Sequence, residues 1–404
     1  MRRQVLGLLV ASASVVALGV GVPAAPVAVA ASPDIRYGVT PKVPVLAYYY
    51  IWFDTGSWDR AKRDFPLVGR YSSNDPDVMR TQIRQAKRAG INGFIVSWKH
   101  TPSLDRRLAT LINVAESEHF SLAMIYQGLD FYRRPLPAER VGADLEFFAR
   151  TYARREPFKL FEKPLVIWSG TWEFSPEDVK RTTDPVRDRL TVLASEKNAN
   201  GYERLADAVD GDAYYWSSVN PDTYPAYEVK LAQMAQTVHD RGGLWIAPAA
   251  PGFDARAIGG TTTVPRDAGR TLLRECAAAF RSKPDAIGLI SWNEFSENSH
   301  IEPSVRNGSR YLSVAAKCSA TGRSGGQIVA SAAADSADSS SPGRGPATGL
   351  LVAPLSVAAM AIAFVAVLRR GRKKPEGRGD EPMDPDTRTR RHRRLEGARR
   401  GWSS

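Results

Sequence analysis

Two glutamates three residues apart, Glu294 and Glu297, are the clearest candidates for chemistry in this sequence. They follow an apolar run at 286–292, and a spacing of three in a turn that begins to coil puts both side chains on one side of the backbone. Two carboxyl groups can cleave a glycosidic bond, because one protonates the leaving oxygen while the other acts as base or nucleophile. This spacing is common on solvated helices, so the prediction depends on the strand end and on the neighbours Trp292 and Asn293.

Aromatic residues recur where the apolar runs end. Five tryptophans stand at or just after such ends: Trp52, Trp98, Trp168, Trp216 and Trp292. Side chains that can bond hydroxyl groups stand at similar places: Gln127, Asp130 and Asp254. Aromatic faces beside polar groups suit a sugar, and apolar surroundings would keep one glutamate protonated near neutral pH. Any single tryptophan is better explained as a core residue, so the predicted sugar site depends on the whole set.

The elements that must position these residues are eight short apolar runs separated by longer amphipathic segments. The runs predict strands buried on both faces, at 45–50, 93–98, 121–126, 164–168, 190–194, 213–216, 244–247 and 286–292. Helices are predicted between them, including 77–89, 103–118, 138–155, 222–241 and 266–281. This alternation predicts the α/β class and a single (β/α)8 TIM barrel, with its site at the carboxyl ends of the strands. The fifth and sixth runs are the least distinct, so a doubly wound sheet stays open.

The two ends of the sequence differ from this central part. Residues 1–31 predict a secretory signal peptide, because two arginines precede an apolar run and small residues. Residues 32–319 would form the barrel, and 320–346, rich in Ser, Ala and Gly, a flexible stalk. Residues 347–368 carry no charge and could cross a bilayer as one transmembrane helix, followed by a basic cytoplasmic tail at 369–404. The sequence therefore predicts a single-pass membrane protein whose barrel is extracellular.

The net charge of +12 belongs mostly to that tail. Residues 369–404 hold 13 Arg and Lys against 6 Asp and Glu, a net charge of +7, and Arg2 and Arg3 add two more. Residues 4–368 therefore carry only about +3, which disfavours nucleic acid as a partner of the folded part. The tail suits the anionic cytoplasmic leaflet of a membrane.

Cysteine and histidine are sparse. Cys276 and Cys318 are the only cysteines, and in an exported protein they could form one disulfide between a late helix and the C-terminal edge. The five histidines are isolated and neither HExxH nor CxxC occurs, so no metal site is predicted. No organic cofactor is implied either, since acid–base hydrolysis needs none.

Several short motifs occur in order between residues 43 and 312. They are Tyr48-Tyr49-Tyr50-Ile51-Trp52, Tyr71-Ser72-Ser73-Asn74-Asp75-Pro76, Ala89-Gly90-Ile91-Asn92-Gly93-Phe94 leading to Ser97-Trp98, Pro251-Gly252-Phe253-Asp254, Asn293-Glu294-Phe295-Ser296-Glu297, Ile301-Glu302-Pro303 and Arg310-Tyr311-Leu312. Together they resemble glycoside hydrolase family 99, the endo-α-mannosidases, and the related WbsX-type proteins of polysaccharide clusters.

The resemblance implies a (β/α)8 barrel that cleaves α-linked, mannose-containing glycans internally and with retention. Glu294 would assist the substrate's own 2-hydroxyl in attacking the anomeric carbon, giving an anhydro-sugar intermediate, and Glu297 would protonate the leaving group and then activate water. Glu302 is expected to be structural. The predicted substrate-binding residues are Tyr50, Trp52, Trp98, Asp254, Trp292, Asn293 and His300; His300 alternatively forms hydrogen bonds only within its loop.

Three positions depart from the residues usual in that family. Phe295 stands where Trp is usual, Asn298 where Gly is usual, and Phe253 where Tyr is usual. The missing tyrosine hydroxyl removes a possible contact to the sugar or to a catalytic carboxylate, so the sugar and its linkage stay open.

Three functions remain in view. The first is a membrane-tethered glycoside hydrolase acting on an extracellular polysaccharide or glycan. The second is a barrel that binds carbohydrate without catalysis. The third is a glycan-assembly protein, for which Asp-x-Asp at 75–77 and 210–212 could hold a metal-bound sugar donor. Both Asp-x-Asp segments precede a predicted element, which favours a helix cap and a turn, and no glycine-rich phosphate loop occurs.

Overall fold

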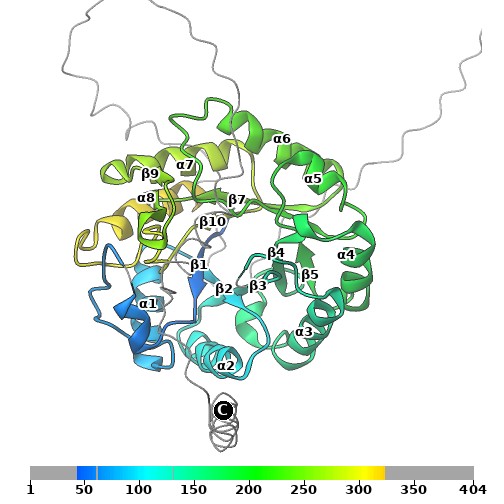
Figure 1. The fold of residues 1–404 in the computed structure, drawn as a ribbon, viewed down its shortest axis with the longest axis horizontal. Helices are drawn as coiled ribbons and strands as arrows, with labels where there is room; N and C mark the ends of the chain where they lie inside the picture. The colour runs from blue at the N-terminus through cyan, green and yellow to red at the C-terminus, as the bar shows by residue number, and fades with distance from the viewer. Residues whose placement is uncertain (1–42, 61, 131, 324–404) are drawn as a thin grey trace, which may run out of the picture.

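The computed structural model describes residues 43–60, 62–130 and 132–323. Eight parallel strands form one sheet in the order β5-β4-β3-β2-β1-β10-β7-β6. A parallel bridge between Ala194 and Asp212 joins the two outer strands, so the sheet closes on itself. Figure 1 shows helices surrounding these strands. The predicted (β/α)8 barrel is confirmed, and the doubly wound sheet is excluded.

The barrel strands agree closely with the apolar runs of the sequence. They are β1 (Val45–Tyr50), β2 (Gly93–Trp98), β3 (Ser121–Gln127), β4 (Leu165–Ser169), β5 (Thr191–Leu193), β6 (Gly211–Ala213), β7 (Leu244–Ala249) and β10 (Ala286–Leu289). The sixth strand differs, because the run predicted at 213–216 lies almost wholly beyond the end of β6. The eighth run likewise continues three residues past β10 and stays buried beneath the loops of the mouth.

One helix follows each barrel strand. The helices are α1 (Pro76–Arg88), α2 (Pro102–Ser117), α3 (Ala138–Thr151), α4 (Pro176–Thr183), α5 (Ala199–Glu203), α6 (Tyr227–Asp240), α7 (Arg270–Arg281) and α8 (Arg310–Arg323). Asp75 caps α1 by accepting a hydrogen bond from the Asp77 amide at 2.9 Å, as the first Asp-x-Asp segment predicts. A small antiparallel hairpin, β8 (Phe253–Asp254) with β9 (Thr263–Val264), lies between β7 and α7.

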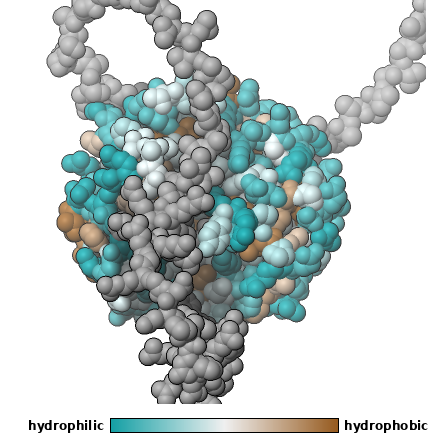
Figure 2. All heavy atoms as spheres, in the orientation of Figure 1, coloured by the Kyte–Doolittle hydropathy of each residue, from teal (hydrophilic) through white to brown (hydrophobic). Residues whose placement is uncertain are grey.

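The core has two parts because successive strand residues point into and out of the barrel. In β1, Leu46 and Tyr48 belong to the cluster inside the barrel, whereas Val45, Ala47 and Tyr49 pack outward against the helices. Both faces are buried, which explains why the runs are continuously apolar rather than alternating. The face of the molecule in Figure 2 is mostly hydrophilic, with apolar residues scattered over it.

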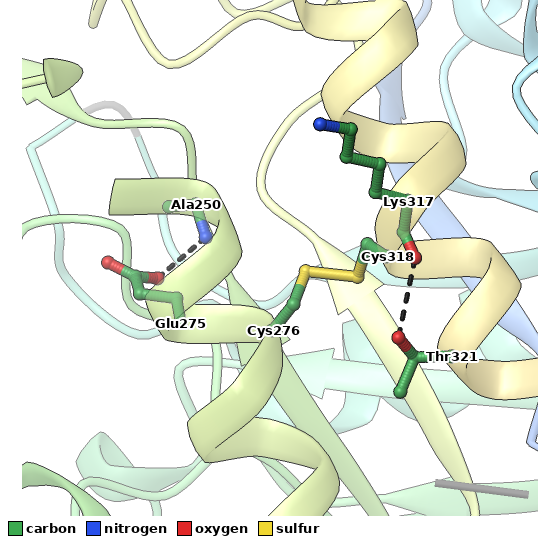
Figure 3. The surroundings of a disulfide bond; sticks show 6 residues. All are labelled: Ala250, Glu275, Cys276, Lys317, Cys318 and Thr321. Carbon is green, nitrogen blue, oxygen red and sulfur yellow. Dashed lines mark hydrogen bonds between the residues drawn. A yellow bond between two sulfur atoms is a disulfide. The ribbon is translucent and has the colours of Figure 1, made fainter. Parts of the chain in front are cut away.

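The barrel domain closes where its two ends meet. β1 pairs with β10, and the Val43 amide donates a hydrogen bond to the Gly322 carbonyl oxygen at 3.4 Å. Nearby, a disulfide between Cys276 of α7 and Cys318 of α8 joins the last two helices, with their Cα atoms 5.9 Å apart (Figure 3). It closes a loop of 42 residues, which in a chain-entropy model stabilises the fold by about 4 kcal/mol.

Several predicted segments lie outside the described residues. They are the signal peptide at 1–31, the transmembrane helix at 347–368, the tail at 369–404 and most of the stalk. The predicted stalk starts at residue 320, but α8 continues to Arg323, so the helix extends into it. Within the described ranges, no helix combines the length and apolar character needed to cross a membrane.

Candidate active site

Glu294 and Glu297 lie in the loop after β10, at the carboxyl end of the barrel. Hydrogen bonds hold the backbone of this loop from both sides. The Glu294 amide donates to Ser291 Oγ at 2.8 Å, and the Ser299 amide donates to the Glu294 carbonyl oxygen at 3.2 Å. The Asp254 amide, at the end of β8, donates to the Glu297 carbonyl oxygen at 2.7 Å. Both glutamates are therefore fixed at the mouth of the barrel.

The Glu294 carboxyl group is buried but has partners that favour its ionised form. Only 7% of the residue is exposed, and burial raises its pKa. The groups that oppose that rise most are the Ser296 amide, which donates to Glu294 Oε1 at 2.8 Å, and the positive charge of Lys62. Lys62 Nζ is held there by a 3.0 Å hydrogen bond to Ser296 Oγ.

The Glu297 carboxyl group has a different environment. Burial, followed by the negative charge of Glu294, raises the pKa of Glu297 to about 8, and Arg133 only partly offsets this. None of the described residues donates a hydrogen bond to its carboxylate. Glu297 therefore keeps its proton near neutral pH while Glu294 ionises more readily, which is the division of roles that an acid and base pair requires.

Two tyrosine hydroxyls lie next to this pair. Tyr50, at the end of β1, and Tyr215, just beyond β6, are hydrogen-bonded to each other through their hydroxyl groups. Burial above all, with both glutamate charges contributing, raises the pKa of each phenol, so both stay neutral. Tyr50 is one of the predicted residues. Tyr215 is not among the predicted residues; it directly precedes Trp216, and alternation at this strand end puts the two side chains on opposite faces.

Trp52 provides an aromatic surface at the mouth. Its ring stacks on Tyr50 with centroids 4.4 Å apart, and 40% of the residue is exposed. This is the arrangement expected of a ring that contacts a sugar face.

Trp98 and Trp292, by contrast, are core residues, and their predicted contact with substrate is wrong. Both are fully buried among the residues outside the barrel. Trp98 Nε1 donates to Asp105 Oδ1 of α2 at 2.9 Å, and Trp292 packs near Phe94. Their side chains point outward to the helices, a direction that proximity to a strand end does not reveal.

Asn293 also lacks the predicted contact with substrate, because it is fully buried and its amide is already paired. Its Oδ1 accepts from the Tyr50 amide at 2.8 Å, while its Nδ2 donates to the Tyr50 carbonyl oxygen at 3.0 Å and to the Tyr71 hydroxyl at 3.1 Å. Asn293 therefore ties the loop after β10 to the end of β1 and positions Tyr50.

Asp254 is likewise a positioning residue rather than a sugar ligand. Arg256 donates to both carboxylate oxygens, at 2.9 and 2.8 Å, and Arg63 lies 3.1 Å from Oδ2. These contacts, the Arg256 hydrogen bond foremost, hold the pKa of Asp254 below its usual range. Its contribution to the site is the backbone hydrogen bond to Glu297.

His300 matches the second of its two predicted alternatives in having a hydrogen-bonding role, but its ring meets Asp64 and Arg266, which lie outside its own loop. It is fully buried, its ring stacks on Phe295 with centroids 4.0 Å apart, and Nε2 lies 3.3 Å from Asp64 Oδ2. Burial lowers the pKa of His300 to about 4, so it is neutral. The predicted contact with substrate is wrong.

Glu302 is buried in a hydrogen-bonded network below the site. Gln82 Nε2 donates to its Oε1 at 2.8 Å and the Tyr71 hydroxyl donates to its Oε2 at 3.0 Å. Burial raises the pKa of Glu302 to about 8. These contacts agree with the expected structural role, although the carboxyl group is not solvated as a loop carboxylate usually is.

No family model matches the chain. It is 20% identical to glycoprotein endo-alpha-1,2-mannosidase of Rattus norvegicus over 266 residues, which cover 60% of this chain and 56% of that protein. It is 22% identical to the glycoprotein endo-alpha-1,2-mannosidase-like protein of Mus musculus, covering 60% of this chain and 58% of that protein. The GH99 endo-alpha-mannosidase of Bacteroides thetaiotaomicron superposes with a TM-score of 0.61 at 19% identity, covering 70% of this chain and 98% of that chain.

The chain resembles glycoside hydrolase family 99. The resemblance predicted from the motifs is thereby confirmed. The chain spans less than two thirds of the length of the curated relatives it matches. The superposition on the solved structure shows that the folds are similar.

The three departures from the usual family 99 residues have structural explanations. Asn298 has a φ of 51°, in the left-handed region that asparagine tolerates better than most residues, so the turn is kept without glycine. Phe295 packs edge-on against Trp58 with centroids 5.5 Å apart. Phe253 is buried in the β8–β9 hairpin with Val264 and brings no hydroxyl group to the site.

Proposed function

We propose that this protein is a glycoside hydrolase that cleaves internal α-mannosidic bonds in a glycan, with Glu294 and Glu297 as its base and acid. The observation that carries this proposal is the difference between two neighbouring carboxyl groups at the mouth of the barrel, that of the buried Glu294 and that of the half-buried Glu297. Glu294 accepts a backbone hydrogen bond and lies near Lys62, and both contacts favour its ionised form. Glu297 has neither contact, and the negative charge of Glu294 raises its pKa further. Pairs of titratable groups whose pKa values are pushed apart are typical of acid–base catalysis.

In the mechanism that the resemblance implies, Glu294 takes the proton of the sugar's own 2-hydroxyl as that oxygen attacks the anomeric carbon. Glu297 gives its proton to the departing glycosidic oxygen. In the second step Glu297 takes a proton from water, the water oxygen attacks the anomeric carbon, and Glu294 returns a proton to the 2-oxygen, so configuration is retained overall.

The surrounding residues then have separate tasks. Tyr50 and Tyr215 supply neutral hydroxyl groups that can donate hydrogen bonds to substrate oxygens or to the glutamates. Trp52 supplies a partly exposed ring for the face of a sugar. The charge of Lys62 favours the ionised form of Glu294, which is the form that accepts a proton.

Two further sources support the choice of substrate and place. The relatives reported above are named endo-alpha-mannosidases, which favours α-mannose linkages. The signals at 1–31 and 347–368 of the sequence support a barrel that works outside the cell on a glycan while tethered to the membrane.

The test is hydrolysis of α-mannans and, for comparison, α-glucans by the purified full-length protein. Glu294→Gln and Glu297→Gln are measured alongside, with Glu177→Gln on the exposed face of α4 as a matched control. We expect oligosaccharides from wild type and from the control, and a loss of about 10²- to 10⁴-fold in both active-site variants. If all four proteins bind mannan and none of them cleaves it, the barrel is a binding protein and the proposal fails.

A further inference from the structure

The rim of the barrel over β3 to β6 presents positive charge that has no carboxylate partner. Lys197, just after β5, holds its ammonium group 4.8 Å from the centre of the Trp172 ring. Lys197 forms no ion pair within the described parts of the chain; the buried carboxylate of its neighbour Glu196 lies 3.5 Å from Arg204, although the charge of Lys197 also acts on it. A cation over an aromatic ring is held in place but keeps its charge and its hydrogen-bond donors for another group.

The aromatic residues beneath Lys197 form a continuous stack. Trp172, after β4, packs against Trp216, after β6, with centroids 5.1 Å apart. Trp216 stacks in turn on Tyr214 at 5.4 Å. Both tryptophans are half-buried, so their packed rings fix the position of Lys197 at the rim. Lys230 Nζ holds Tyr214 in this stack by donating a 2.8 Å hydrogen bond to its hydroxyl group.

Arg133 adds a second cation on the same side. It is exposed in the loop between β3 and α3 and forms no ion pair with any described residue. Its positive charge offsets part of the rise in the pKa of both Glu297 and Tyr215, so it lies near the proposed catalytic pair. The loop that carries it packs on the turn after β4, where Leu129 fills the space beside Gly170, two residues before Trp172.

This rim differs from the outer surface of the barrel, where arginines are neutralised by carboxylates on neighbouring helices. Examples are Arg155 with Glu116, Arg189 with Glu146 and Arg281 with Glu228. Trp216 directly follows Tyr215, whose hydroxyl group faces the catalytic pair through Tyr50. Alternation turns Trp216 to the face opposite Tyr215, where it stacks on Tyr214, so a glycan contacts Trp172 and Lys197 where it leaves the mouth and crosses the end of β6.

We infer that the rim cation site, defined as Arg133, Trp172, Lys197 and Trp216, binds a negatively charged substituent, phosphate or carboxylate, on a sugar of the glycan. The inference rests on the proposed function and narrows its substrate class to anionic α-mannose glycans. Ammonium and guanidinium groups both pair with phosphate and carboxylate, and the tryptophans contact the sugar that carries the charge.

The test measures binding separately from cleavage. The full-length protein with Glu297→Gln is titrated with mannan oligosaccharides of equal length in three forms: neutral, carrying a phosphate monoester, and carrying a uronate carboxylate. We expect at least one anionic form to bind about tenfold more tightly than the neutral form, and 0.5 M salt to remove most of the difference. Comparison of the two anionic forms identifies the substituent.

Variants in the same background locate the effect. Lys197→Gln and Arg133→Gln should each remove a severalfold part of the preference, while Lys180→Gln, whose lysine is paired with Asp184 on α4, should change nothing. Arg133 is exposed on a loop, so its variant tests the site even if Lys197→Gln disturbs the aromatic stack.

Equal binding of all three forms, or a preference that survives both variants, would overturn the inference. Wild-type protein is assayed for cleavage of the same oligosaccharides. If it cleaves the neutral form and no anionic preference exists, only the rim cation site is refuted. If it cleaves none of them, the proposed hydrolase is refuted on separate grounds.

Discussion

Glu297 and Glu302 stand five residues apart in one loop, and burial raises the pKa of each to about 8. Their surroundings nevertheless differ. Both oxygens of Glu302 accept hydrogen bonds, from Gln82 and Tyr71, so the group is fully paired. The Glu297 carboxyl group accepts none from the described residues and faces the mouth beside Glu294. A raised pKa therefore does not separate the proposed catalytic carboxyl group from the structural one; the two differ in unused hydrogen-bonding capacity at the mouth.

The largest expected effect is a difference in activity between Glu297→Gln and Glu302→Gln. Glu297→Gln should lower kcat by about 10²- to 10⁴-fold and leave the melting temperature nearly unchanged, because the side chain supports no hydrogen bond of the fold. Glu302→Gln should keep kcat within severalfold of wild type. Initial rates on α-mannan and thermal unfolding test both, and equal losses of activity in the two variants would break the comparison.

The second expected effect concerns two tyrosine hydroxyl groups, that of Tyr215 near Glu297 and that of Tyr71 bonded to Glu302. Tyr215→Phe removes the hydroxyl group beside the proposed catalytic pair and should lower kcat/KM by roughly 10- to 100-fold. Tyr71→Phe removes a hydroxyl group that bonds only Glu302 and Asn293. Its main effect should be a loss of roughly 1–3 kcal/mol in the free energy of unfolding. Denaturant titration and steady-state kinetics on both variants decide whether the functions divide in this way.

The third expected effect is a pH dependence of stability. The raised pKa means that folded Glu302 holds its proton in a window, from about pH 4.5 to about 8, where the unfolded group has lost it. Folding therefore binds a proton there, and stability falls as the pH rises, by at most about 1.4 kcal/mol per pH unit from this residue. Glu302→Gln should flatten that slope in urea unfolding measured from pH 5 to 8. An unchanged slope would show that Glu302 does not titrate with folding.

The smallest expected effect concerns the rim. Trp52→Ala should raise KM for mannan by roughly 2- to 10-fold with little change in kcat, because the exposed ring contributes stacking and not chemistry. Trp98→Ala serves as the contrast, since Trp98 is buried and should cost roughly 3–5 kcal/mol of stability. A large fall in kcat for Trp52→Ala would place that ring nearer the reacting atoms than the structure indicates.

The sequence predicted the barrel well because parallel strands buried on both faces leave continuous apolar runs. The catalytic candidates could also be found, since both glutamates come shortly after the apolar run at 286–292. The direction of a side chain could not be predicted, because a tryptophan at a strand end points either into the mouth or out to the helices. The wrong predictions for Trp98 and Trp292 follow from this.

Hydrogen bonds between residues that lie far apart in the sequence could not be predicted either. Asn293 bonds the backbone of Tyr50, 243 residues away, and Asp64 approaches His300 from 236 residues away. Polar residues beside a catalytic motif therefore looked like substrate ligands when they are positioning residues. Lys62 was out of reach for the same reason, because it carries no local signal that connects it to the loop after β10, whereas Tyr215 is recognisable only from the alternation that sets it opposite Trp216.

The hydrogen bond between Val43 and Gly322 places both ends of the barrel domain together at the start of β1. Strands begin on that face and end at the mouth, so the two attachment points share the face opposite the glutamates. An anchor or fusion joined to either end would leave the mouth clear for a bulky polymer. The same proximity makes the domain suited to circular permutation, with a short linker across the old ends and a new opening in a surface loop between helix and strand.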